Sequence, residues 1–190
     1  SAQLAEPMPP LIKVEEMKAV YITSNTALSP RVEKIISLIK ETELNSVVID
    51  IKNDRQTFLG DNMKSLIRRL RFADIYPVAR LPVFQHDGLA LEHSQLALKN
   101  PSGALWRDSG GRHWLDPASQ DVWKIILEEA RQAAKMGFGE INLDYIRFPS
   151  DGKLDGVIYP VWDKQISRVE IINNFSRFIV DNLRKEFPEV

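Results

Sequence analysis

Glu140-Ile141-Asn142-Leu143-Asp144-Tyr145-Ile146 alternates polar and apolar side chains, and this stretch decides the fold. Asn142 and Asp144 stand at alternate positions, with apolar residues between and around them. Successive side chains of a β-strand point to opposite faces, so the two polar side chains share one face and the apolar ones share the other. The stretch therefore predicts a strand that is packed on one face and carries a carboxylate on the other.

The same alternation occurs in three earlier β-like runs, at residues 19–24, 47–51 and 78–84. The polar residues that fall on one parity in or just after the four runs are Tyr21, Thr23, Asp50, Lys52, Arg80, Asn142 and Asp144. Most of them lie toward the carboxyl ends of their strands, where α/β folds have their active sites. We expect these side chains to converge on one shared interior.

Amphipathic helical segments separate the runs, at about residues 30–43, 62–73, 117–136 and 167–187. For the third segment the sequence predicts Asp116 as the N-cap, with Pro117 at the first helical position. Strands that alternate with helices pair in parallel through right-handed crossovers. A doubly wound sheet would bury the charged side chains of this face beneath helices at a high free-energy cost. A (β/α)₈ barrel instead exposes them at the catalytic mouth. The pattern favours the barrel.

The length sets how much of a barrel is present. A complete (β/α)₈ barrel needs about 250 residues, but the 190 residues of this chain show four β/α units. We therefore predict an α/β fold in which parallel β/α units form the N-terminal half of a TIM-type barrel, at residues 18–190, behind a Pro-rich leader or linker at residues 1–17. A small four-stranded α/β domain is the alternative.

Composition narrows the functional classes. The chain has 25 Lys and Arg against 26 Asp and Glu, and this balance argues against a dedicated nucleic-acid-binding protein. It has no cysteine, which excludes disulfides and thiol nucleophiles within it. No apolar run approaches the roughly 20 residues that span a bilayer. The leader has no signal-peptide pattern, but it is compatible with a linker behind a secretion signal, so we expect an extracellular or cell-envelope location.

The block Asp144-Tyr145-Ile146-Arg147-Phe148-Pro149 resembles a bacterial family of glycoside hydrolase domains that is distantly related to the α-amylase type of (β/α)₈ barrel. The resemblance covers nearly the whole chain from Lys18 onward. Further segments that agree lie at residues 18–23, 42–54, 105–108 and 114–117. The resemblance implies hydrolysis of O-glycosidic bonds in a polysaccharide. A non-catalytic carbohydrate-binding or cell-wall-associated domain is the alternative.

By this resemblance, Asp144 occupies the end of strand four, where α-amylase-type enzymes have their nucleophile. Glycosidases generally use a second carboxyl group to protonate the leaving oxygen. In the α-amylase scheme that acid comes from strand five, which we do not find here. The resemblance therefore implies that this stretch alone hydrolyses nothing.

The remaining candidate residues each have a structural alternative. Asp50 is either a second carboxylate of the mouth or the ion-pair partner of Arg80, and Asp144 itself could form a salt bridge to Arg80 or Lys52. Arg147 either orients Asp144 or forms a structural pair. The candidates for substrate binding are Arg80, Arg147, Lys52, Tyr21, Asn142, Trp106 and Trp114. For the two tryptophans, packing of a hairpin at residues 105–115 is as good an explanation as a sugar-stacking wall.

Cofactor and metal sites are not expected. His86, His93 and His113 lack metal-ligand spacing, and the Asp-Gly pairs at residues 151–152 and 155–156 read as turns rather than a calcium loop. No P-loop and no dinucleotide-binding glycine pattern is present. The expected partner is a carbohydrate substrate. A half-barrel also exposes two sheet edges, so we expect self-association as a homodimer.

Overall fold

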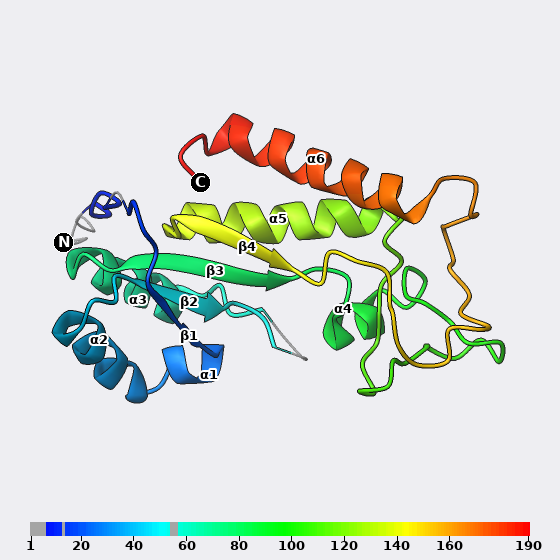
Figure 1. Cartoon of the computed structure of the whole chain (residues 1–190), viewed down its shortest axis with the longest axis horizontal. Coiled ribbons are helices and arrows are strands. Elements are labelled where there is room, and N and C mark those ends of the chain that lie inside the picture. The colour runs from blue at the N-terminus through cyan, green and yellow to red at the C-terminus, as the bar shows by residue number, and fades with distance from the viewer. Residues whose placement is uncertain (1–6, 13, 54–56) are drawn as a thin grey trace, which may run out of the picture.

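The computed structural model describes residues 7–12, 14–53 and 57–190. Its centre is a four-stranded parallel sheet in the order β1-β2-β3-β4. The strands are β1 (Ala19–Ile22), β2 (Ser46–Asp50), β3 (Tyr76–Pro82) and β4 (Glu140–Asp144), with their carboxyl ends at a common edge (Figure 1). The order along the sheet equals the order along the chain, as the predicted β/α units require.

Four long helices follow the strands in turn. They are α2 (Arg31–Glu41), α3 (Asp61–Phe72), α5 (Gln120–Met136) and α6 (Arg168–Glu186). Apolar side chains of β2 and β3, such as Ile49 and Leu81, are fully buried and belong to the same hydrophobic core as Ile67 of α3 and Ile126 of α5. Burial of these apolar strand side chains against the helices provides most of the driving force for the fold.

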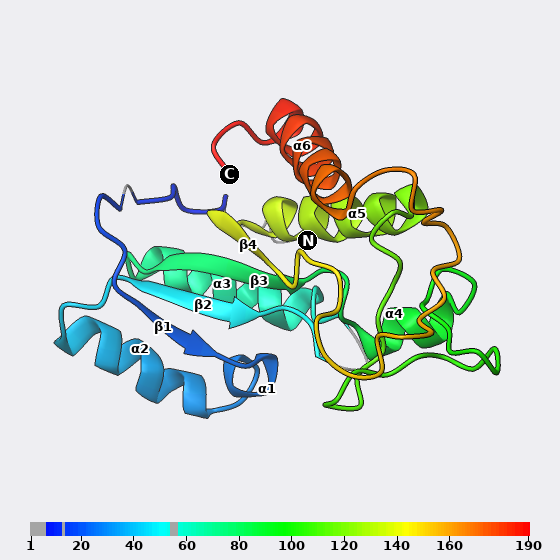
Figure 2. The same cartoon turned by 45° about the vertical axis from the view of Figure 1, so that its right-hand side comes forward.

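Two short helices, α1 (Ser24–Ala27) and α4 (Asp87–Glu92), were not predicted. Each follows the end of a strand, α1 after β1 and α4 after β3, and each is capped by a side chain, Thr23 and His86 respectively. Both lie at the carboxyl end of the sheet, where they help to form the rim around the polar side chains of the strands (Figure 2).

Helix α5 begins later than predicted. Its N-cap is Ser119, whose hydroxyl accepts a hydrogen bond from Val122 N, rather than Asp116. The buried Asp116 carboxylate accepts hydrogen bonds from Val161 N and Trp162 N, at 2.8 and 2.9 Å. Asp116 therefore fastens the long β4–α6 loop to the body of the domain instead of starting a helix.

The loops at the carboxyl end of the sheet are long and ordered by their own hydrogen bonds. Arg107 and His113 form an antiparallel bridge, so the predicted hairpin at residues 105–115 is present. Asp108 N donates to Arg112 O and Gly111 N donates to Asp108 O, which closes its turn. This hairpin and the β4–α6 loop lie beside each other beyond the strand ends (Figures 1 and 2).

The described part of the leader, residues 7–12 and 14–17, forms neither helix nor strand, and Leu11 and Ile12 line a cavity with Tyr76 and Glu140 at the amino ends of β3 and β4. Residues 1–6 and 13 of the predicted leader lie outside the described residues. Among the helices of the described residues, none combines the length and the apolar character needed to span a membrane.

Candidate functional site

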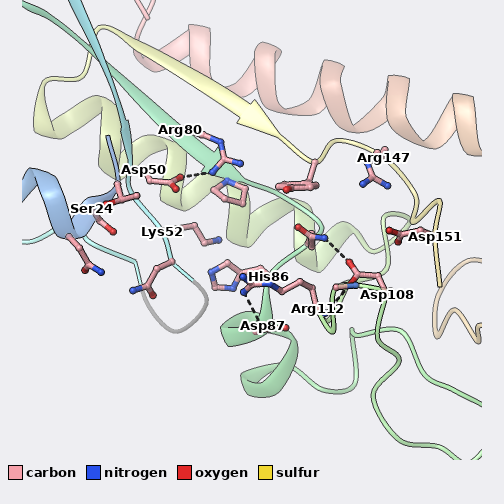
Figure 3. Close-up of a pocket in the computed structure, with 17 residues that line it drawn as sticks. Ser24, Asp50, Lys52, Arg80, His86, Asp87, Asp108, Arg112, Arg147 and Asp151 are labelled. Atoms are coloured by element: carbon pink, nitrogen blue, oxygen red, sulfur yellow. Dashed lines mark hydrogen bonds and ion pairs between the residues drawn. The ribbon is translucent and has the colours of Figure 1, made fainter. Parts of the chain in front are cut away.

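The arginine of the third strand binds the acids of both neighbouring strands. Arg80 Nη1 donates to Asp50 Oδ1 at 2.7 Å, and its Nε and Nη2 donate to Asp144 Oδ2 at 2.9 and 2.6 Å. Asp50 ends β2 and Asp144 ends β4, and both positions pair with residues of β3 in the sheet register. Figure 3 shows Arg80 and Asp50 bonded beside the pocket. The structure thus brings together three of the predicted polar residues.

The two carboxylates lie within reach of one sugar unit. The guanidinium fork is narrow, so the oxygens that bind its two ends are no more than about 8 Å apart. Pairs of carboxyl groups in glycosidases lie about 5 to 9.5 Å apart. The upper bound on the Asp50–Asp144 separation therefore lies below the longest spacing that glycoside hydrolysis uses.

Two tyrosines flank the Arg80 guanidinium, which lies 5.9 Å from the Tyr21 ring centroid and 5.8 Å from that of Tyr145. The Tyr21 hydroxyl donates to Asp50 Oδ2 at 2.5 Å. Burial and then the hydrogen bond and charge of Asp50 raise the pKa of Tyr21 to about 12. Burial alone would lower the pKa of Arg80, but the hydrogen bonds and charges of Asp50 and Asp144 outweigh it and raise that pKa.

The backbone bends sharply directly after Asp144. Tyr145 has φ of +54°, in the left-handed region that non-glycine residues seldom adopt, and its N–H donates to Asp144 Oδ1 at 2.7 Å. This bend ends β4 at Asp144, two residues earlier than the predicted strand. Unfavourable backbone conformations of this kind concentrate at ligand and active sites, where the surrounding structure holds them.

A polar cavity of about 540 Å³ opens beside this cluster. The sheet contributes Asp50, Arg80 and Pro82, and the loops contribute most of the rest of its wall (Figure 3). Asp144, which binds Arg80, is not among the lining residues. The lining residues from the loops and helices are Thr23, Ser24, Asn25, Lys52, Asn53, Gln85, His86, Asp87, Asp108, Gly110, Arg112, Tyr145, Arg147 and Asp151. The volume is that of an ordinary small-molecule or sugar site.

Asp108 holds the hairpin against the cavity. Its Oδ2 accepts from Trp114 Nε1 and Gln85 Nε2, and its Oδ1 accepts from the backbone of Gly110 and Arg112. Burial alone would raise the pKa of Asp108, but these four hydrogen bonds outweigh it and lower that pKa. The carboxylate is therefore a rigid structural acceptor in the wall of the site.

Arg147 lines the cavity beside the hairpin. Its guanidinium lies 4.8 Å from the Trp114 ring centroid and donates to Ser150 Oγ at 2.9 Å. Trp114 is fully buried beneath it, and Trp106 is also buried, with its indole N–H bonded to Lys153 O. Both tryptophans therefore pack the hairpin in this structure.

Lys52 and Asn142 stand apart from the Arg80 cluster. The Lys52 ammonium is buried and bonds to Glu129 Oε2 of α5 at 2.7 Å, although Lys52 is also one of the residues that line the cavity. Lys52 lies two residues after Asp50, beyond the end of β2, and its ammonium turns to α5 instead of Asp144. Asn142 is exposed on β4 and lies outside the lining of the cavity.

The cavity residues of the loops, above all Gln85, Asp87, Asp108, Arg112 and Asp151, were not predicted. A strand pattern cannot find them, because they reach the site through loops that pack over long distances. The one available signal was the length of the segment between the third strand and the next helix, since such loops are often functional. Among the described residues, no group of three or more His, Asp or Glu side chains could hold a metal ion.

Comparison with known proteins shows the family and the fold. A family model described as "Putative glycosyl hydrolase domain" matches residues 19–187. Comparison with curated protein sequences gives no match. A hypothetical protein of Ruminiclostridium thermocellum, solved as a crystal structure, is 29% identical with a TM-score of 0.77, over 86% of this chain and 92% of that one.

Two solved glycosidases share the fold at low identity. An α-amylase of Lactobacillus plantarum has a TM-score of 0.62 at 13% identity and covers 90% of this chain. An α-galactosidase of Lactobacillus brevis has a TM-score of 0.58 at 12% identity and covers 92%. This chain spans 42% and 26% of those two proteins. The predicted fold is confirmed: four β/α units form half of a TIM-type barrel, and the chain belongs to the glycosyl hydrolase domain family whose model matches residues 19–187.

Proposed function

We propose that this domain is the N-terminal half of a glycoside hydrolase that acts on a polysaccharide, with Asp144 as its nucleophile. The observation that carries the proposal is the position of Asp144 at the carboxyl end of β4, where it binds Arg80, which lines the polar cavity together with Asp50. Carboxyl ends of barrel strands are where TIM-barrel enzymes carry their catalytic residues.

The chemistry would divide between Asp144 and an acid outside these four units. An Asp144 oxygen attacks the anomeric carbon, and the bond to the leaving oxygen breaks as that oxygen takes a proton. Asp50 is an unsuitable proton donor in this arrangement, because one of its oxygens accepts from Arg80 and the other accepts from Tyr21. Asp50 then serves as the second carboxylate of the mouth, which fixes Arg80 and Tyr21 beside the sugar.

The open, polar cavity supports a long carbohydrate substrate. Its wall presents carboxylates, guanidinium groups and amides from several loops, which match the hydroxyl groups of neighbouring sugar units. A polysaccharide of the bacterial envelope or environment would place the protein outside the cell or at its envelope.

The test is turnover by a longer parent protein that contains all eight β/α units. We expect Asp144→Asn to lower the release of reducing ends at least about 10³-fold while sugar binding, measured by calorimetry, persists. Asp181→Asn, on the exposed side of α6, is the matched control and should leave turnover unchanged. Equal turnover in the two variants would contradict the proposal. The 190-residue chain alone is expected to release no reducing ends.

One observation favours a second candidate, a non-catalytic carbohydrate-binding domain. Every carboxylate oxygen of Asp50 and Asp144 already accepts a hydrogen bond within the protein, which suits a rigid binding surface. In this case the unmodified parent protein would bind glycans but hydrolyse none of them.

A further inference from the structure

Arg147 lies in a corner between two aromatic rings in the wall of the cavity (Figure 3). Its Cζ atom is 4.8 Å from the Trp114 ring centroid and 5.7 Å from that of Tyr145, and the two rings stand at 89° to each other. Asp108 accepts a hydrogen bond from the Trp114 indole N–H at 2.8 Å, which fixes the larger ring. The guanidinium is therefore positioned before a ligand arrives, which lowers the conformational entropy that binding costs.

The hydrogen bonds of Arg147 leave one edge of its guanidinium available. Both bonds use Nη1, which donates to Phe148 O at 3.3 Å and to Ser150 Oγ at 2.9 Å. Among the described residues, none accepts a hydrogen bond from Nε or Nη2, and the side chain is exposed. The N–H bonds of Nε and Nη2 run side by side in one plane, so this edge fits the two oxygens of a carboxylate.

Arg147 also differs from the other cations of the cavity in its charge balance. The other Lys and Arg side chains in the lining each face a carboxylate, and the pairs are Lys52 with Glu129, Arg80 with Asp50 and Asp144, and Arg112 with Asp87. No Asp or Glu side chain in the described part of the chain forms an ion pair with Arg147. The charge of Arg147 is therefore available to a ligand in the cavity.

One acid in the wall opposes an anionic ligand. Asp151 lies four residues after Arg147, is exposed and lines the same cavity. Both residues lie within the described structure, which shows no ion pair between them. Asp151 would repel an anion bound beside it, so the two side chains predict opposite effects on the affinity for an acidic sugar.

We propose that the substrate is an acidic polysaccharide, and that Arg147 binds the carboxylate of one of its uronic acid units through Nε and Nη2. A neutral sugar would remove water from this cation without supplying an anion, at a cost in free energy. The inference rests on the proposed function for the presence of a sugar chain in the cavity, and it adds the class of that sugar. Arg147 determines specificity here and takes no part in bond breaking.

Binding calorimetry with the longer parent protein tests the inference, with Asp144→Asn in place so that no probe is hydrolysed. The probes are short oligosaccharides of pectate, alginate and hyaluronate, each compared with its neutral, carboxyl-reduced form. We expect at least one acidic probe to bind, and Arg147→Met to lower its affinity about 10- to 100-fold. Arg147→Lys should recover only part of this loss, because an ammonium keeps the charge but has no planar fork. The neutral form should bind more weakly and be nearly insensitive to both substitutions.

Arg107→Met is the matched control, because Arg107 is an exposed arginine of the hairpin outside the lining of this cavity, and the affinity should not change. Asp151→Asn removes the opposing charge and should raise the affinity for the acidic probe about twofold. Equal affinities for acidic and neutral forms, equal losses in Arg107→Met and Arg147→Met, or no binding of any acidic probe would overturn the inference. A sulfated dextran oligosaccharide that bound more tightly than every uronate would also overturn it.

These results separate the inference from the proposed function. Turnover of a neutral glycan that depends on Asp144 but not on Arg147 would leave a glycoside hydrolase in place and overturn the acidic substrate. Arg147-dependent binding of an acidic probe that the unmodified parent protein does not hydrolyse would support the inference and contradict hydrolysis of that polysaccharide.

Discussion

Two ionic clusters start from positions two residues apart on the chain, yet they differ in nearly every physical respect. Asp50 joins Arg80 and Asp144 at the mouth of the half-barrel, where the three side chains keep 14%, 21% and 44% of their surface exposed. Lys52 joins Glu129 beneath the loops, where the ammonium-bearing side chain is 0% exposed. The difference shows that the alternation of side chains along a strand predicts the surroundings of Asp50, which belongs to β2, but not those of the Lys52 ammonium beyond the end of β2.

The electrostatic consequences are opposite. Asp50 and Asp144 raise the pKa of Arg80 against the effect of burial. Burial dominates at Lys52 and lowers its pKa, although the hydrogen bond and charge of Glu129 oppose the shift. The mouth cluster is therefore an open surface with charges available to a ligand, whereas the Lys52–Glu129 pair contributes to the structure.

The largest expected effect on stability comes from the buried pair. Lys52→Met leaves the Glu129 carboxylate without its cation, and Thr57 Oγ1 remains its hydrogen-bond donor. We expect a loss of about 3–5 kcal/mol in the free energy of unfolding, measured by urea denaturation. The control is the double variant Lys52→Met/Glu129→Leu, which should recover most of the loss. A single variant within 1 kcal/mol of the original protein would show that the pair is not structurally important.

Arg80→Met should have a smaller effect on stability, because the mouth cluster is open to solvent. Three charge-assisted hydrogen bonds disappear, and two carboxylates remain that water can hydrate. We expect a loss of about 1–2 kcal/mol by the same measurement. If Arg80→Met cost more than Lys52→Met, the contrast between an open and a buried cluster would be wrong.

Tyr21→Phe should have the smallest effect at neutral pH and a distinctive one at high pH. The fold raises the pKa of Tyr21 to about 12, so it favours the protonated phenol over the unfolded chain, where the pKa is about 10. The stabilisation is complete below pH 10 and is lost as the pH rises toward 12. Unfolding measured between pH 9 and 12 should therefore show a steeper loss for the original protein than for Tyr21→Phe; parallel curves would contradict the Tyr21–Asp50 contact.

The sheet could be predicted because its information is local and periodic. Residues 47–51 and 140–146 show which face is apolar, and the two strands appear at Ser46–Asp50 and Glu140–Asp144. Their ends could not be placed to the residue. At β4 the end depends on the left-handed conformation of Tyr145, which the hydrogen bond to Asp144 helps to hold.

The candidate site was predictable only where strands form it. Parity alone predicts that Asp50, Arg80 and Asp144 share one face, and register then brings them into contact. Parity does not predict that Lys52 turns to Glu129, because that contact joins residues 77 positions apart and depends on how α5 packs. The same limit hid Asp108, whose place in the cavity wall depends on the hairpin.

Covalent trapping of the nucleophile in the longer parent protein tests the central claim most directly. An activated 2-deoxy-2-fluoro glycoside of a sugar that the parent hydrolyses should form a stable ester, and mass spectrometry should locate it on the peptide that contains Asp144. Labelling of a different carboxylate, or turnover with no label and inversion at the anomeric carbon, would contradict the role of Asp144.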